Sequence, residues 1–85
     1  MKTKDDVWMK ACYIDGIIKN RFNKSIKRDL ACMISAFRIC NRDYDSIYGF
    51  LEDEVEFHAK TVDYLNSIRG YIFGYTQSAT ASGHK

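Results

Sequence analysis

The sequence of 85 residues contains no proline and only five glycines. Proline and glycine mark most of the turns that an all-β chain requires, so this composition argues against a sheet protein. Apolar residues instead recur at intervals of three and four, which is the spacing of an amphipathic helix. The length fits one domain. We therefore predict an all-α fold, a three-helix bundle with a long C-terminal helix.

Three segments carry this helical spacing, and short polar turns separate them. The first helix is predicted over about residues 4–20, the second over about 24–40 and the third over about 44–75. Together they form a single helical domain over residues 1–75. Residues 76–85 are small and polar, and we expect them to be a disordered tail.

Polar residues at the expected helix ends support these boundaries. Thr3, followed three residues later by Asp6, forms a weak capping box for the first helix. Asn20 and Asn23 bracket the first turn, because asparagine tolerates the left-handed conformation that ends helices. Asp43 is placed to cap the third helix.

The first two helices each have one predicted line of core side chains. In the first helix the line consists of Val7, Ala11, Ile14, Ile18 and Phe22. In the second helix it consists of Ile26, Leu30, Met33, Phe37 and Cys40. Each line is one stripe, as expected for a helix that covers a single core.

The third predicted helix differs because it carries two apolar stripes. A heptad seam runs through Tyr44, Tyr48, Leu51, Val55, His58, Val62, Leu65, Arg69 and Ile72. A second line of aromatic residues repeats every seven positions at Phe50, Phe57, Tyr64 and Tyr71. The two stripes together cover nearly half of the helix surface.

Two short helices are not long enough to shield both stripes along a helix of this length. Each is about 25 Å long, whereas the third would extend about 48 Å. Aromatic rings left bare would rival the largest apolar patch that a monomer exposes. We therefore predict a homodimer or another protein partner, bound through Ile47, Phe50, Glu54, Phe57, His58, Tyr64, Ile68 and Tyr71. The alternative is that these side chains are ordinary core of a compact bundle.

Charge is distributed unevenly along the chain. Residues 1–42 carry ten bases and four acids, whereas residues 43–85 carry three bases and seven acids. Five bases gather near the first turn, at Lys19, Arg21, Lys24, Lys27 and Arg28. Such a cluster suits phosphates or an acidic protein surface. The acids early in the third helix disfavour its insertion into a DNA groove.

The sequence offers little catalytic or metal-binding chemistry. Cys12, Cys32 and Cys40 lack the spacing of zinc ligands, and we expect them to be small core side chains. His58 has leucines as its neighbours on the heptad seam, which favours a hydrogen-bonded core histidine over a catalytic one. The acidic run 52–56 lacks the loop of a calcium site. We predict no enzyme activity, no cofactor and no bound metal.

No apolar run approaches the length of a membrane span, and the first residues lack the apolar segment of a signal peptide. These features predict a cytoplasmic protein without membrane contact. Short helical chains of this kind are typical of inhibitors and adaptors, including those that phages and mobile elements make against host defence machinery. We therefore predict a small non-enzymatic inhibitor or adaptor that occupies the surface of a partner protein. The alternative is a helical regulator that binds DNA or RNA through residues 19–28.

Overall fold

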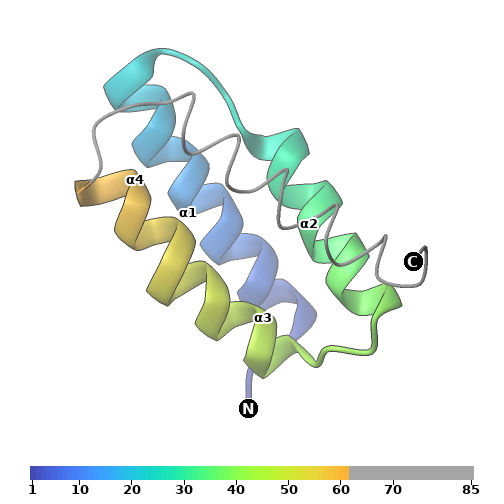
Figure 1. Ribbon diagram of the computed structural model, residues 1–85. Coiled ribbons are helices and arrows are strands. Elements are labelled where there is room, and N and C mark those ends of the chain that lie inside the picture. The colour runs from blue at the N-terminus through green and yellow to red at the C-terminus, as the bar shows by residue number, and fades with distance from the viewer. Residues whose placement is uncertain (62–85) are drawn as a thin grey trace, which may run out of the picture.

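The computed structural model describes residues 1–61. Within this range the chain forms helices joined by short turns and contains no β-strand, which confirms the predicted all-α class. The elements are α1 (Lys4–Phe22), α2 (Lys27–Ile39), α3 (Tyr44–Phe50), the π-helix η1 (Leu51–Glu56) and α4 (Phe57–Thr61). Because α3, η1 and α4 follow one another without a break, they form one rod (Figure 1).

The chain reverses direction after α1 and again after α2, so the three helical rods run side by side (Figure 1). α1 packs against each of the other four elements in residues 1–61. The predicted third helix agrees with the rod over residues 44–61, and its remaining part, 62–75, lies outside the described residues, as does the predicted tail 76–85.

α1 begins and ends at the polar residues that the sequence indicates. The Thr3 hydroxyl accepts a hydrogen bond from the backbone N–H of Asp6, and the Asp6 carboxylate accepts one from the backbone N–H of Thr3. Asn23 adopts a left-handed conformation with φ of 57° and donates its backbone N–H to the carbonyl of Lys19. The predicted capping box and the closing asparagine are confirmed.

α2 begins at Lys27, three residues later than predicted. Its N-cap is Ile26, which has no side chain able to accept from the helix. The carboxylate of Asp15 in α1 instead holds the residues just before the helix, accepting from the backbone N–H of Ile26 at 2.7 Å and from the hydroxyl of Ser25 at 2.9 Å. The hydroxyl of Ser25 in turn accepts from the backbone N–H of Lys27 at 3.2 Å. A side chain from another helix therefore fixes where α2 starts.

α3 begins where the sequence predicts. Asp43 caps it by accepting from the backbone N–H of Ser46 at 2.8 Å. The preceding turn contains Asn41 with φ of 65°, a conformation that asparagine tolerates better than most residues. The second predicted turn is therefore short, and Asn41 and Asp43 fix its conformation.

Apolar side chains from α1, α2 and the rod form one core. The residues buried in it are Val7, Ala11, Ile14, Ile18, Ile26, Leu30, Met33, Ile34, Phe37, Ile47, Phe50, Leu51, Val55 and Ala59. Phe22, at the end of the predicted α1 line, is partly buried against the same core. The predicted core lines of α1 and α2 are therefore largely confirmed.

The three cysteines contradict the prediction, because all of them are exposed. Cys12 and Cys32 each lie one position away from a buried residue, about 100° around the helix, and this rotation takes them off the core stripe. Cys40 follows the last residue of α2 and lies at its end instead of on its buried face. The core stripes of α1 and α2 are narrower than the sequence suggests.

Candidate protein-binding surfaces

The predicted aromatic line of the third helix is divided within the described residues. Phe50 is buried, and its ring contacts the ring of Phe37 edge to face with centroids 5.4 Å apart. Phe57, seven residues later, is 55% exposed. The two rings that the heptad pattern places on one line therefore face different environments, one in the core and the other in solvent.

The π-helix between the two phenylalanines explains this division. A π-helix adds about one residue per turn, so the residues that follow it lag by roughly 100° relative to a continuous α-helix. Leu51, Val55 and Ala59 are all completely buried at a constant spacing of four. In a continuous α-helix, two side chains four residues apart point in directions that differ by about 40° around the helix axis. The wider turn of the π-helix cancels this difference, so all three side chains point toward the core. The same rotation carries Phe57 away from the core.

Ile47 was predicted as an interface residue, and it is completely buried in the core of the single chain. Phe50 is only 9% exposed. Neither side chain forms part of the surface, so the interface prediction is corrected for both of them: they pack into the core that the rod shares with α1 and α2. Three further predicted interface residues lie outside the described residues: Tyr64, Ile68 and Tyr71.

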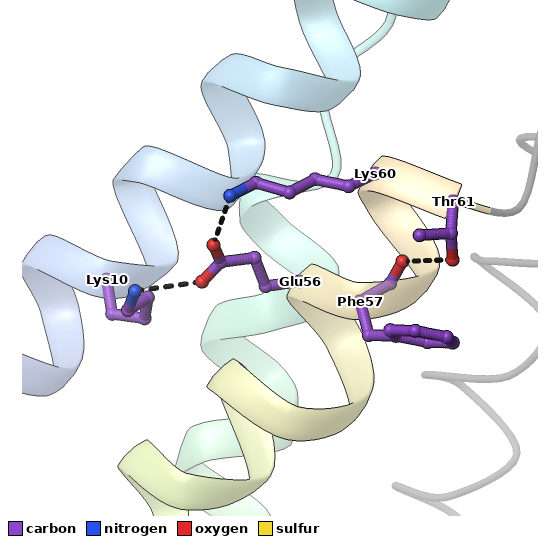
Figure 2. Close-up of polar contacts among 5 residues, drawn as sticks. All are labelled: Lys10, Glu56, Phe57, Lys60 and Thr61. Carbon is purple, nitrogen blue, oxygen red and sulfur yellow. Dashed lines mark hydrogen bonds and ion pairs between the residues drawn. The ribbon is translucent and has the colours of Figure 1, made fainter.

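Phe57, His58 and Glu54 remain at the surface or near it. The ring of His58 lies edge to face with that of Phe57, with centroids 5.8 Å apart. Nδ1 of His58 lies 2.7 Å from the carbonyl oxygen of Glu54, so the half-buried histidine is hydrogen-bonded within its own helix, as the sequence favours. Figure 2 shows Phe57 pointing away from the neighbouring ion-pair cluster.

That cluster consists of Lys10, Glu56 and Lys60 (Figure 2). The carboxylate of Glu56 lies 2.8 Å from the ammonium of Lys10 and 2.7 Å from that of Lys60. The side chains of Lys10 and Glu56 are only 14% and 12% exposed. The hydrogen bond from Lys10, together with that from Lys60, lowers the pKa of Glu56, and the bond to Glu56 raises the pKa of Lys10.

Removing the carboxylate is expected to destabilise the fold in a pH-dependent manner. Glu56→Gln should lower the free energy of unfolding by about 1–2 kcal/mol at pH 7, because Lys10 loses a charged hydrogen-bond partner. Since the pKa of Glu56 is below its ordinary 4.5, this stabilisation is present above that pH and is lost as the pH falls further. Since the pKa of Lys10 is above its ordinary 10.5, the stabilisation is also lost as the pH rises beyond that value.

Urea unfolding of the two proteins at a series of pH values measures the difference. Asp53→Asn is the matched control, because Asp53 is exposed and lies in the same π-helix. It should leave the free energy of unfolding within about 0.5 kcal/mol of the original. Equal stability of Glu56→Gln and the original at pH 7, or a difference that widens on acidification, would contradict the assignment.

The predicted basic cluster lies at the end of the bundle where α1 finishes and α2 begins. Lys19, Lys24, Lys27 and Arg28 are exposed, and no ion pair within residues 1–61 engages them. Arg21 behaves differently, because its guanidinium donates to the backbone carbonyl of Ala59 and ties the end of α1 to α4. Four of the five predicted bases thus share one exposed end.

An exposed apolar feature that the sequence pattern did not indicate lies on α1. Met9 is 70% exposed and Tyr13 is 51% exposed. With Asp5, Trp8 and Cys12 they line a shallow groove whose surface is mostly apolar. Trp8 also belongs to a second groove, shared with Ile34, Ile39 and Tyr44 across the edge of α2. The predicted core line of the first helix includes neither Met9 nor Tyr13, and no interface was predicted for them.

Residues 1–61 contain neither a metal-binding cluster nor a membrane-spanning helix. There, no group of three His, Cys, Asp or Glu side chains is arranged to hold a metal ion. In the same residues, no helix combines the length and apolar content needed to cross a membrane. Comparisons with protein-family models, with curated proteins and with solved structures give no match.

Proposed function

We propose that this chain is a non-enzymatic protein-binding module that acts as a small inhibitor or adaptor by covering a surface of another protein. The observation that carries the proposal is the exposed ring of Phe57, held on a continuous helical rod and turned away from the core by the π-helix. An aromatic ring on a rigid backbone supplies large contact area at little cost in conformational entropy. π-Helical turns are also frequent at functional sites.

The charges beside Phe57 suggest the chemistry of the partner surface. Glu52 and Asp53 are exposed in the turn that precedes the ring, and Glu54 is half-buried. Acids at the rim of an apolar contact steer association with a surface of opposite charge. The partner surface is therefore expected to combine an apolar pocket for the ring with surrounding lysine or arginine side chains.

Affinity capture with the full chain from its source cells tests this function. Phe57→Glu should reduce recovery of the bound protein at least about tenfold, because a charge would have to enter an apolar pocket. Ile39→Glu is the matched control, since Ile39 is 77% exposed but lies on α2, and its recovery should match the original. Equal recovery with Phe57→Glu, or capture of no protein by the original chain, would contradict the proposal.

The second candidate is a regulator that binds DNA or RNA. The observation in its favour is the shared exposed end that carries Lys19, Lys24, Lys27 and Arg28. Phosphate contacts by several bases give affinity that falls steeply with salt concentration. A gel shift with random duplex separates the two functions: steep, salt-sensitive binding supports the regulator, and no binding supports the protein-binding module.

A further inference from the structure

The outer side of α1, opposite the buried core line, combines apolar character with small side chains. We define the α1 outer face as Asp5, Met9, Cys12, Tyr13 and Gly16, all of which are exposed. Four of them, at positions 5, 9, 12 and 16, are separated by steps of four, three and four. This alternation is the spacing of a seam along which one helix packs against another.

We propose that the α1 outer face binds the same face of a second copy of the chain, with the two α1 helices antiparallel across a two-fold axis. A two-fold axis allows one surface to bury itself, so no other partner is needed to cover the groove. This inference uses a different surface from that of Phe57 and goes beyond the proposed function. It also moves the predicted homodimer contact from the aromatic line to α1.

Size complementarity supports a second copy as the occupant. A side chain built at Gly16 would meet no other atom within 4 Å, so the space above this residue is open. Met9 is a long, flexible side chain that projects into solvent seven residues earlier. When the two helices cross between Cys12 and Tyr13, Met9 of each copy lies opposite Gly16 of the partner subunit. The small Cys12 at the centre lets the two backbones approach closely.

Charge complementarity selects the antiparallel direction. The first turn of α1 contains Asp5 and Asp6, and its last turn contains Lys19 and Arg21. In the proposed register Asp5 lies opposite residue 20 of the partner subunit and therefore beside the partner's Lys19. A parallel pair would place like charges together at both ends. The antiparallel pair also aligns the two helix dipoles in opposite directions.

The contact is expected to be of modest affinity. α1 has 19 residues and is about 28 Å long, so one face of it is smaller than the roughly 800 Å² per partner of a standard interface. Trp8, which lines this groove and the adjoining one, extends the apolar area on one side. A dissociation constant in the micromolar range follows, and self-association should therefore depend on concentration.

Light scattering on the full chain between about 1 µM and 1 mM tests the self-association. The mass should rise from 9.9 kDa towards twice that value. Met9→Glu should raise the dissociation constant about 30-fold or more, because it places a charge from each copy within the apolar contact, opposite Gly16 of the partner subunit. Phe57→Glu is the matched control, because Phe57 lies on the rod and not on the α1 outer face. This substitution should leave the dissociation constant of the dimer unchanged. A mass that stays at one chain at every concentration, or a dimer indifferent to Met9→Glu, would overturn the proposal.

Cross-linking tests the direction of the pair. In a chain whose three cysteines are replaced by serine, single cysteines are introduced as Asp5→Cys or Asn20→Cys. These positions are about 22 Å apart along one helix. Under a mild oxidant, a mixture of the two variants should form a disulfide between positions 5 and 20 of different copies, because only the antiparallel pair brings them within about 7 Å. Disulfides within each variant alone would show a parallel pair, and no disulfide would show that α1 is not the contact.

The two proposals fail separately. A monomeric chain that still loses its partner on Phe57→Glu would overturn the α1 pairing and leave the protein-binding function standing. A chain that forms the disulfide between positions 5 and 20 but captures no partner would overturn the proposed function and leave the α1 pairing standing.

Discussion

Replacing Phe37 with alanine is expected to lower the free energy of unfolding by about 4 kcal/mol. The ring of Phe37 is completely buried and contacts Phe50 edge to face. The guanidinium of Arg42 lies over the same ring, 4.2 Å from its centroid. The substitution would remove the ring contact between α2 and the rod, leave a cavity, and remove the nearer of the two aromatic rings beside Arg42. Small domains have about 5–15 kcal/mol in total, so the substitution would remove a large share of the stability.

Urea unfolding followed by circular dichroism at 222 nm provides the measurement, with Ile39→Ala as the control. Ile39 lies two residues away on the same helix, but most of its surface is exposed. Its truncation should change the free energy of unfolding by less than about 0.5 kcal/mol. A Phe37→Ala protein as stable as Ile39→Ala would show that the contact between α2 and the rod is not where the structure places it.

The elements that the sequence predicts well are those fixed by local signals. The capping residues Thr3 and Asp43 act within three residues of their partners, so they are visible in the sequence. The buried lines through Val7 and Ile14 in α1, and through Leu30 in α2, follow the ordinary helical period. For these parts a one-dimensional pattern is enough, because the contacts repeat with the helix itself.

The π-helix was not predictable by the same means. A heptad pattern assumes about 100° per residue throughout, and a single wide turn changes the direction of every later side chain. No residue type in Leu51–Glu56 marks such a turn. Packing of Leu51, Val55 and Ala59 against the other helices favours it, and that packing depends on the whole fold. The placement of Phe50 and Phe57 on one aromatic line failed for this reason.

Of the candidate binding surfaces, the sequence indicated one and did not indicate the other. Phe57 is exposed, as a surface interface residue must be. Its exposure results from the π-helix, however, which the heptad pattern did not predict. The α1 outer face was missed because Met9, Cys12 and Tyr13 continue the apolar surroundings of the buried stripe. The neighbouring helices decide which of the apolar side chains of α1 face solvent.

Asp15→Ala is expected to lower the free energy of unfolding by about 2–3 kcal/mol. Asp15 is the one charged residue that is buried in residues 1–61, and its carboxylate is the acceptor for the backbone N–H at the start of α2. Its partners, Ser25 and Ile26, are ten and eleven residues away in the sequence, so no local sequence pattern predicts the contact. Alanine would leave the N–H of Ile26 buried and without an acceptor, which costs the full desolvation of that group.

Two milder substitutions separate the capping role from simple loss of packing. Asp15→Asn keeps an acceptor oxygen and should cost about 1 kcal/mol. Ser25→Ala removes the hydroxyl that donates to Asp15 and accepts from the backbone N–H of Lys27, but it leaves the bond between Asp15 and Ile26 in place and should also cost about 1 kcal/mol. Amide exchange at Ile26 supplies a local readout, because its N–H is protected only while the acceptor is present. If Asp15→Ala leaves both the free energy of unfolding and this protection unchanged, α2 begins at Lys27 for a reason other than the carboxylate of α1.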